Sequence, residues 1–206
     1  LFMLGELPWQ RREKINLLLP APLSAAQNYL VPKLCPPNVD IIEVDARRML
    51  RLERYFYVSQ LARRGCGFLP DYYLRHFLER VSPRRPRSKN RRIYISRNKA
   101  IARQIVNEEE LISALKREGF ESYALEDLPI REQIETFHDA EFVVAAHGAG
   151  LVNLLFAEGA KVLELFPGPS IRPHYYFLSK ARGHQYAFLR TCESRTFASR
   201  MLNDFE

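Results

Sequence analysis

The sequence predicts an α/β protein. Its main part is a doubly wound parallel sheet with helices on both faces, preceded by a smaller or truncated α/β domain. Three observations predict this fold. After Arg91, short apolar runs alternate with segments of helical periodicity, which is typical of βαβ units. A basic, proline-containing stretch from Ser82 to Arg92 separates this regular half from a less regular one. Within the regular half, a strand pattern changes to a helical one at His147-Gly148-Ala149-Gly150.

The amino-terminal half has the weaker patterns. A short helix is predicted from Pro8 to Leu19, because its apolar residues fall on or near one face, and proline-rich connections follow it. Residues 39–44 predict a strand, and residues 54–58 are compatible with another. The stretch DYYLRHFLERV, residues 71–81, has the apolar spacing of a helix. We therefore expect a first α/β domain over residues 1–85.

The basic stretch from Ser82 to Arg92 combines two prolines with six basic side chains. One interpretation is a solvated connection between domains. The other is an electrostatic patch for phosphates or an anionic membrane surface, formed by Arg84, Arg85, Arg87 and Lys89. Specific nucleic-acid binding is not expected, because no aromatic residues for base stacking are interleaved there.

The regular half begins with a predicted strand at residues 92–96. A helix follows over residues 107–118, where Asn107 and Glu110 have the spacing of a capping box. Gly119 is expected to end this helix, because glycine is favoured just after a helix terminus.

The alternation then continues to the end of the sheet. Further strands are predicted at residues 122–125, 142–146, 161–166 and 185–189, and further helices at residues 130–139, 151–156 and 177–182. Within the second helix, Ile134 and Phe137 are expected to face inward. This half gives a second domain over residues 86–206.

Composition restricts the class of partner. The 206 residues carry a formal charge of +7, which favours a phosphate ligand, an anionic membrane surface or nucleic acid without choosing among them. Three widely spaced cysteines form no metal-binding pair. No apolar run is long enough to span a bilayer, and the first residues do not resemble a signal peptide.

Candidate site residues follow the strands of the predicted sheet. Ser96 and Arg97 end its first strand, Lys99 and Arg103 lie in the next loop, and Glu164 lies near the end of a later strand. Ligands of open α/β sheets gather at the carboxyl ends of the strands. We therefore expect these side chains to meet the segment from His147 to Gly150 at one edge.

The two glycines suggest a phosphate site at that edge. Gly148 and Gly150 leave the backbone open to close approach, and the helix expected after them directs free N–H groups to the same place. Arg97 and Arg103 would supply forked donors that match phosphate oxygens, and His147 a further donor. Each feature alone is more often structural: a tight turn, a histidine bound to a loop carbonyl, or surface charges.

Several familiar sites are absent from the sequence. It has no phosphate loop of the G-x-x-x-x-G-K-[ST] type, no G-x-G-x-x-G fingerprint and no G-x-S-x-G elbow. No DxD motif follows a strand, and Asp139-Ala140-Glu141 is interpreted as a helix terminus. We expect neither a metal ion nor another cofactor.

The stretches ISRNKAIARQIVNEEEL and GFESYALEDLPIREQIETFHDAEFVVAAHGAGLVNLLFAEGAKVLELF resemble the carboxyl-terminal region of family 61 glycosyltransferases. The resemblance is strong from about Arg91 to Arg190, and a bacterial member is expected. It implies a GT-B architecture, in which two Rossmann-like domains face each other. It also implies metal-independent, inverting transfer of a hexose or pentose from a nucleotide sugar, UDP-linked in our expectation, to a glycan or protein hydroxyl.

The resemblance also implies roles for individual residues. Ser96, Arg97 and Arg103 would hold the donor diphosphate together with Gly148, Ala149 and Gly150. Asn153 and Glu164 would serve the nucleotide, and His147 is the candidate catalytic residue. The family's usual HGAGLTN has Val152 in place of threonine here. The family's first domain is also longer than the part before Arg91, so residues 1–85 would form a truncated acceptor side.

Two other functions remain open at this point: a nucleotide-binding module without turnover, and a basic protein that binds nucleic acid or a membrane through Ser82–Arg92. We expect a cytoplasmic protein, peripheral to the membrane if the basic stretch binds lipid headgroups. The Golgi or endoplasmic reticulum lumen is the alternative for a eukaryotic chain with a missing anchor.

Overall fold

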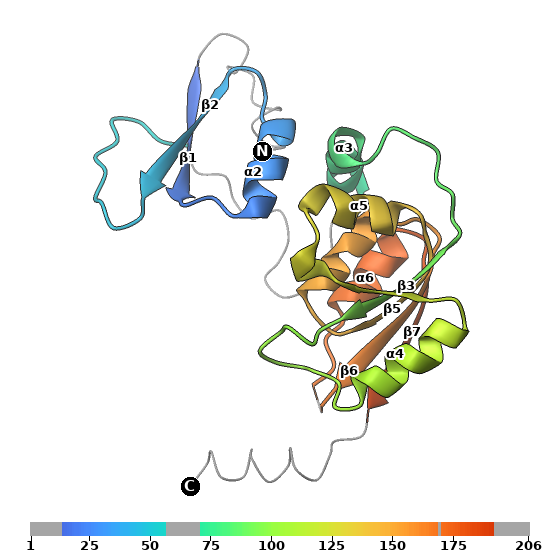
Figure 1. Ribbon diagram of the computed structural model, residues 1–206. Coiled ribbons are helices and arrows are strands. Elements are labelled where there is room, and N and C mark those ends of the chain that lie inside the picture. The colour runs from blue at the N-terminus through green and yellow to red at the C-terminus, as the bar shows by residue number, and fades with distance from the viewer. Residues whose placement is uncertain (1–13, 57–70, 169, 192–206) are drawn as a thin grey trace, which may run out of the picture. The chain divides into compact units, whose positions relative to one another are not determined.

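The computed structural model describes residues 14–56, 71–168 and 170–191 (Figure 1). These residues fall into two compact units, which divide between Ser82 and Pro83. The first contains residues 14–56 and 71–82, and the second contains the described residues from 83 onward. The assignment of two domains to the acceptor and donor sides stays a prediction.

The first unit contains a parallel pair of strands, β1 (Ile15–Ala21) and β2 (Val39–Asp45), with Ile15 opposite Val39. Helix α2 (Ala25–Leu34) connects them and begins with a capping box. The Ser24 hydroxyl accepts from the Gln27 amide at 3.2 Å, and the Gln27 side chain accepts from the Ser24 amide at 2.9 Å. Helix α3 (Asp71–Val81) lies beside α2. The described part of this unit therefore contains a β-α-β crossover.

Three predictions for this unit change. Residues 8–19 were predicted to form a helix, but Ile15–Leu19 lies in a strand, and residues 8–13 lie outside the described residues. Periodicity alone cannot assign such a short apolar run, and its pairing with β2 determines the structure. Helix α2 was not predicted, because Pro32 lies inside it. Residues 54–56 form no strand, and residues 57 and 58 are not among the described residues. The strand at residues 39–44 and the helix at 71–81 are confirmed.

The second unit is built on a five-stranded, wholly parallel sheet of order β4-β3-β5-β6-β7. All five strands were predicted, with ends that shift by up to two residues. Their bounds are Arg91–Ser96, Glu121–Ala124, Ala140–Ala146, Lys161–Pro167 and Gln185–Thr191 for β3 to β7. The chain leaves β3 for β4 on one side and then returns to β5 on the other. The strand order thus reverses at β3 and β5.

Helices cover both faces of this sheet (Figure 1). Helix α4 (Glu108–Arg117) packs on one face, where Leu111, Ile112 and Leu115 surround a cluster of Tyr94, Val144 and Leu165. The other face carries α5 (Ile130–His138), the 3₁₀ helix η2 (Ala149–Phe156) and α6 (His174–Ala181). Ile134 and Phe137 are buried as predicted. The doubly wound α/β fold is confirmed for this unit.

The ends of the helices differ in detail from the predictions. The Asn107 side chain makes no capping hydrogen bond to the backbone of α4, so the predicted capping box does not form; it donates to Glu110 at 3.3 Å instead. Gly119 follows α4 with φ of +79°, as a glycine after a helix should. A 3₁₀ turn, η1 (Leu125–Asp127), precedes α5.

The basic stretch is bound to the amino-terminal edge of the sheet. Arg85 donates to both oxygens of Asp139, at 2.8 and 2.6 Å, and the Ser88 amide donates to the same carboxylate at 3.1 Å. These donors hold the pKa of Asp139 well below its usual range. Arg87 lies 3.5 Å from Glu158. Two of the four residues predicted for a membrane patch are thus engaged in ion pairs, and the patch gains no support. No helix in the described part of the chain is long and apolar enough to cross a bilayer.

Candidate active site

The candidate site lies where the strand order of the sheet reverses. Arg97 follows β3, and His147 follows the neighbouring strand β5. Open parallel sheets bind ligands at such a switch point, outside the carboxyl ends of the strands. The fold therefore brings together two segments that are 50 residues apart in the sequence.

Arg97 and Gly148 are in close contact. A Cβ atom on Gly148 would lie 1.9 Å from Nη1 and 2.7 Å from Cζ of Arg97, so the guanidinium group rests against a bare backbone. The φ of Gly148 is 177°, an extended value that any residue adopts. Glycine is required here for the close approach of Arg97, whereas the approach of a ligand phosphate to this backbone stays a prediction.

The Arg97 side chain is held at one end and has an unused donor at the other. Nη2 donates to the carbonyl of Ala102 at 3.1 Å. Nε is buried and has no hydrogen-bond partner among the described residues. A buried N–H without a partner is unfavourable.

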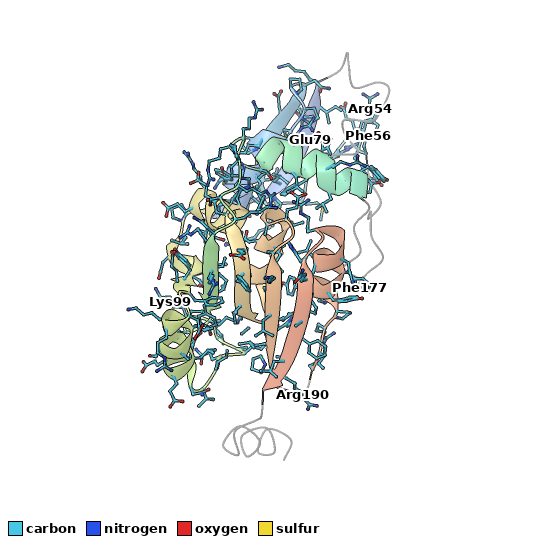
Figure 2. All side chains as sticks on the ribbon, turned by 90° about the vertical axis from the view of Figure 1, so that its right-hand side faces the viewer. Arg54, Phe56, Glu79, Lys99, Phe177 and Arg190 are labelled. Carbon is cyan, nitrogen blue, oxygen red and sulfur yellow. The ribbon has the colours of Figure 1, made fainter. Side chains whose placement is uncertain are left out.

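Arg103 lies close enough to Arg97 for their charges to interact. Burial first, and then the charge of Arg103, lower the pKa of Arg97, whereas Glu126 opposes this effect. Arg103 is exposed and has a left-handed φ of 60°. Lys99 is paired with a carboxylate: its ammonium group lies 2.5 and 2.7 Å from the two oxygens of Asp127. Figure 2 shows Lys99 and Phe177 on opposite sides of the second unit.

His147 is fixed on three sides. Its Nδ1 lies 2.5 Å from Oε1 of Glu164, and its ring stacks on Phe166 with centroids 4.9 Å apart. The edge of Tyr175 lies 5.5 Å from the same ring, centroid to centroid. Tyr175 also interacts electrostatically with Glu164, Arg103 and Arg97.

Glu164 lies behind His147. Its side chain has no exposed surface, and its second oxygen accepts from the Tyr186 hydroxyl at 2.5 Å. We expected this carboxylate to contact the nucleotide, but both of its oxygens are already bound. In this structure it supports the histidine.

The helix that follows the glycines is more tightly wound than an α-helix and begins two residues earlier than predicted. It is a 3₁₀ helix starting at Ala149 instead of an α-helix starting at Leu151. Its first bond joins the Leu151 amide to the Gly148 carbonyl at 3.0 Å, so the amides of Ala149 and Gly150 precede its hydrogen-bonding pattern. Ala149 is exposed and Gly150 half-buried. These two N–H groups stand at the positive end of the helix.

Three further predicted residues support the site from within. A Cβ atom on Gly150 would lie 2.9 Å from Cδ1 of Leu125, so this glycine is needed for packing. Ser96 is buried, and its hydroxyl accepts from the Asn98 amide at 3.2 Å. Asn153 is buried and donates to Gln133 of α5 at 3.1 Å, which ties η2 to that helix. None of these side chains is presented to a ligand in this structure.

Sequence reasoning missed the residues that hold the site together. Glu108 is buried at the start of α4, where it accepts from the Tyr94 hydroxyl at 2.6 Å and from the Arg97 amide at 3.1 Å. It thereby fixes the loop that carries Arg97. The signal was the acidic first turn of α4 after the arginine loop, which we assigned to capping alone. Tyr175 and Tyr186 had no local signal, because their roles depend on contacts across the sheet.

The described residues contain no group of three or more histidine, cysteine, aspartate and glutamate side chains that could hold a metal ion. The positive charge of the site is supplied instead by Arg97, Arg103 and the start of η2. The arrangement suits an anionic ligand with several oxygen atoms, such as a diphosphate.

Fold and site together define a Rossmann-like α/β unit with a cationic site at its switch point. Comparison with known families is consistent with this class: residues 4–163 match the model of Glycosyltransferase 61, and the chain belongs to that family.

Curated relatives include the EGF domain-specific O-linked N-acetylglucosamine transferase of Rattus norvegicus, 32% identical over 122 residues. That match covers 55% of this chain and 23% of the rat protein. The protein of the same name from Drosophila melanogaster is 33% identical over 53% of this chain and 21% of its own length. A beta-1,2-xylosyltransferase of Arabidopsis thaliana is 28% identical over 34% of this chain and 14% of its own length. The match spans less than a quarter of each of these relatives.

Proposed function

We propose that this chain is the donor-binding part of an inverting glycosyltransferase. It transfers a sugar from a nucleotide sugar, UDP-linked in our proposal, to a hydroxyl group of a glycan or protein. The observation that carries this proposal is the convergence of Arg97, Arg103 and His147 beside the start of η2. The named relatives, which transfer N-acetylglucosamine and xylose by their names, support a hexosyl or pentosyl transfer.

The chemistry follows from where charge develops. Cleavage of the bond between the sugar and the diphosphate leaves negative charge on the diphosphate oxygens. Arg97 and Arg103 would bind these oxygens with charge-assisted hydrogen bonds, and the buried Nε of Arg97 would gain its missing partner. The amides of Ala149 and Gly150 would add two further donors at the same end of η2. His147 would donate from Nε2, since Nδ1 is bound to Glu164.

The finer architecture is part of the same proposal. In a GT-B enzyme a second Rossmann-like domain supplies the acceptor side. The parallel β1–α2–β2 crossover of the first unit supports this assignment. We place the protein in the cytoplasm, with the Golgi or endoplasmic reticulum lumen as the alternative for a eukaryotic chain.

Calorimetric titration with UDP, GDP and other nucleoside diphosphates tests donor binding. The wild-type protein is compared with Arg97→Ala and Arg103→Gln, and Arg117→Ala serves as a control because Arg117 lies exposed in the last turn of α4. The two site variants should lose affinity by about tenfold or more, as expected for charge-assisted contacts, and the control should not. Equal affinity in all four proteins would refute the site.

Release of nucleoside diphosphate from nucleotide sugars tests turnover. Transfer or slow hydrolysis supports the enzyme. Diphosphate binding without any release would instead identify a nucleotide-binding module, the alternative that the sequence left open.

A further inference from the structure

We propose that Glu164 and Tyr186 are positioning residues for His147. Glu164 fixes the tautomer of the histidine and raises its basicity, and Tyr186 lowers that basicity through its hydrogen bond to Glu164. Their part in sugar transfer rests on the function proposed above. Their effect on the histidine does not, and it can be measured without a substrate.

The three residues form a chain across three adjacent strands. His147 follows β5, Glu164 lies in β6 and Tyr186 lies in β7. Tyr186 pairs with Val162, which lies two residues before Glu164 and on the same face of the sheet. The Tyr186 hydroxyl donates to Oε2 of Glu164 at 2.5 Å. Oε1 of the same carboxylate lies 2.5 Å from Nδ1 of His147. Because the pairing of β6 with β7 fixes the positions of Glu164 and Tyr186, this chain of hydrogen bonds is held in place by the sheet.

The direction of each hydrogen bond follows from the chemistry of the groups. Burial, and then the bond to Glu164, raise the pKa of Tyr186, so its hydroxyl keeps its proton and donates. An ionised carboxylate can only accept, so Nδ1 of His147 must carry a proton. Nε2 has no partner among the described residues. The neutral histidine therefore presents a lone pair at Nε2, and the protonated histidine presents an N–H donor there.

The surroundings of His147 leave Glu164 as its main electrostatic partner. The stacked ring of Phe166 carries no charge, and Tyr175 of α6 is neutral because burial raises its pKa. Tyr175, whose edge lies against His147, also interacts electrostatically with Arg97 and Arg103 of the loop after β3. Glu164 is therefore the charged group in direct contact with His147, and a change in its charge should alter the protonation of the imidazole.

Substitutions of the two positioning residues should shift the pKa of His147 in opposite directions. Glu164→Gln removes the negative charge beside the imidazole, so the pKa of His147 should fall. Tyr186→Phe removes one of two donors from the carboxylate, which then attracts the Nδ1 proton more strongly, so the pKa of His147 should rise. Shifts of about one pH unit are expected for a charge and about half a unit for a single hydrogen bond. A merely structural role predicts no such reversal.

The test is an NMR titration of the histidine ring resonances in the full chain. The chain has five histidines, so the His147 signal is assigned by its loss in His147→Asn. Nitrogen-15 shifts report whether Nδ1 or Nε2 carries the proton. Tyr123→Phe is the matched control, because it removes another tyrosine hydroxyl that donates to a carboxylate, that of Glu121, away from His147. The control should leave the His147 titration unchanged.

Shifts in the same direction in both variants, or no shift in either, would overturn the proposal. If Glu164→Gln does not fold, the upward shift in Tyr186→Phe decides alone. UDP titration of the same proteins separates the two proposals. Opposite shifts without any nucleoside-diphosphate binding would uphold the positioning role and refute the donor site. Binding with an unchanged His147 titration would do the reverse.

Discussion

The contact between Arg97 and Gly148 explains why a glycine follows the histidine. The guanidinium group occupies the space that a side chain at position 148 would need, although the backbone there is extended and unstrained. The two glycines of this segment thus serve different purposes. The absence of a side chain at Gly148 leaves space for the Arg97 guanidinium group, and its absence at Gly150 leaves space for the Leu125 side chain.

Alanine substitutions should separate these purposes. In Gly148→Ala the new methyl group displaces the mobile end of Arg97, so UDP affinity should fall about tenfold while the free energy of unfolding changes by less than ~1 kcal/mol. In Gly150→Ala the methyl group presses on Leu125 inside the packed layer, which should cost about 1–3 kcal/mol of stability. Calorimetry with UDP and urea unfolding measure both quantities. A large stability loss and unchanged affinity in Gly148→Ala would contradict this assignment.

At this scale the sequence predicted the residue types of the site better than their contacts. Arg97, Arg103 and His147 were assigned to one edge of the sheet because strand ends can be located from periodicity, and their binding roles stay predictions. The burial of Glu164 and the pairing of Lys99 with Asp127 could not be predicted, because both depend on distances between strands and loops that the sequence does not encode locally.

His184 connects three elements at the other edge of the sheet. The ring accepts from the Ala160 amide before β6 through Nδ1 and donates to the Leu154 carbonyl of η2 through Nε2, both at 3.1 Å. The residue itself directly precedes β7. Only the neutral ring can make both bonds, and burial lowers the pKa of His184 to about 4.

Stability should therefore decrease in mild acid. The folded-state pKa lies below the unfolded value of about 6.5, so the unfolded chain binds the proton first. The contribution of His184 is complete above pH ~7, decreases as the pH falls and levels off below pH ~4, for a total loss of roughly 3 kcal/mol. Urea unfolding between pH 4 and pH 7 measures this slope.

His184→Gln should be less dependent on pH over the same interval, because an amide offers a donor and an acceptor without titrating. An identical slope in the variant and the wild-type protein would exclude His184 as the cause. The ion pair of Arg85 and Asp139 titrates in a lower window, since the pKa of Asp139 is held below its usual value near 4.

Elements were predictable where long patterns existed. The five strands of the second unit and its α-helices follow from alternating runs and clear terminators such as Gly119. The strand at residues 15–21 and helix α2 were not predictable. A short apolar run and a proline inside a helix give ambiguous local signals, and the pairing of β1 with β2 determines the structure here.

For the whole molecule, the excess of positive charge is distributed between structural and functional groups. Arg85, Arg87 and Lys99 each pair with a carboxylate. Within the described part of the chain, Arg97 and Arg103 form no ion pair with a carboxylate, and their charges interact with each other. The net charge of +7 predicted an acidic partner but could not locate it. The fold shows that Arg97 and Arg103 lie at the switch point without an ion pair among the described residues.

Donor binding should not require a metal ion, because the arginines and the start of η2 already supply positive charge. UDP affinity is expected to be equal within about twofold in EDTA and in manganese. Loss of affinity in EDTA that manganese restores would contradict this expectation. Zinc serves as a control for nonspecific effects of divalent ions on the basic protein.

The close approach of Arg97 to Gly148 makes these two positions one thermodynamic unit. If alanine at position 148 acts only by displacing the guanidinium, it has nothing left to displace in an Arg97→Ala background. A double-mutant cycle on UDP binding should then be strongly non-additive, with the double variant no weaker than Arg97→Ala alone. The need for glycine at position 148 therefore lasts only as long as an arginine occupies position 97.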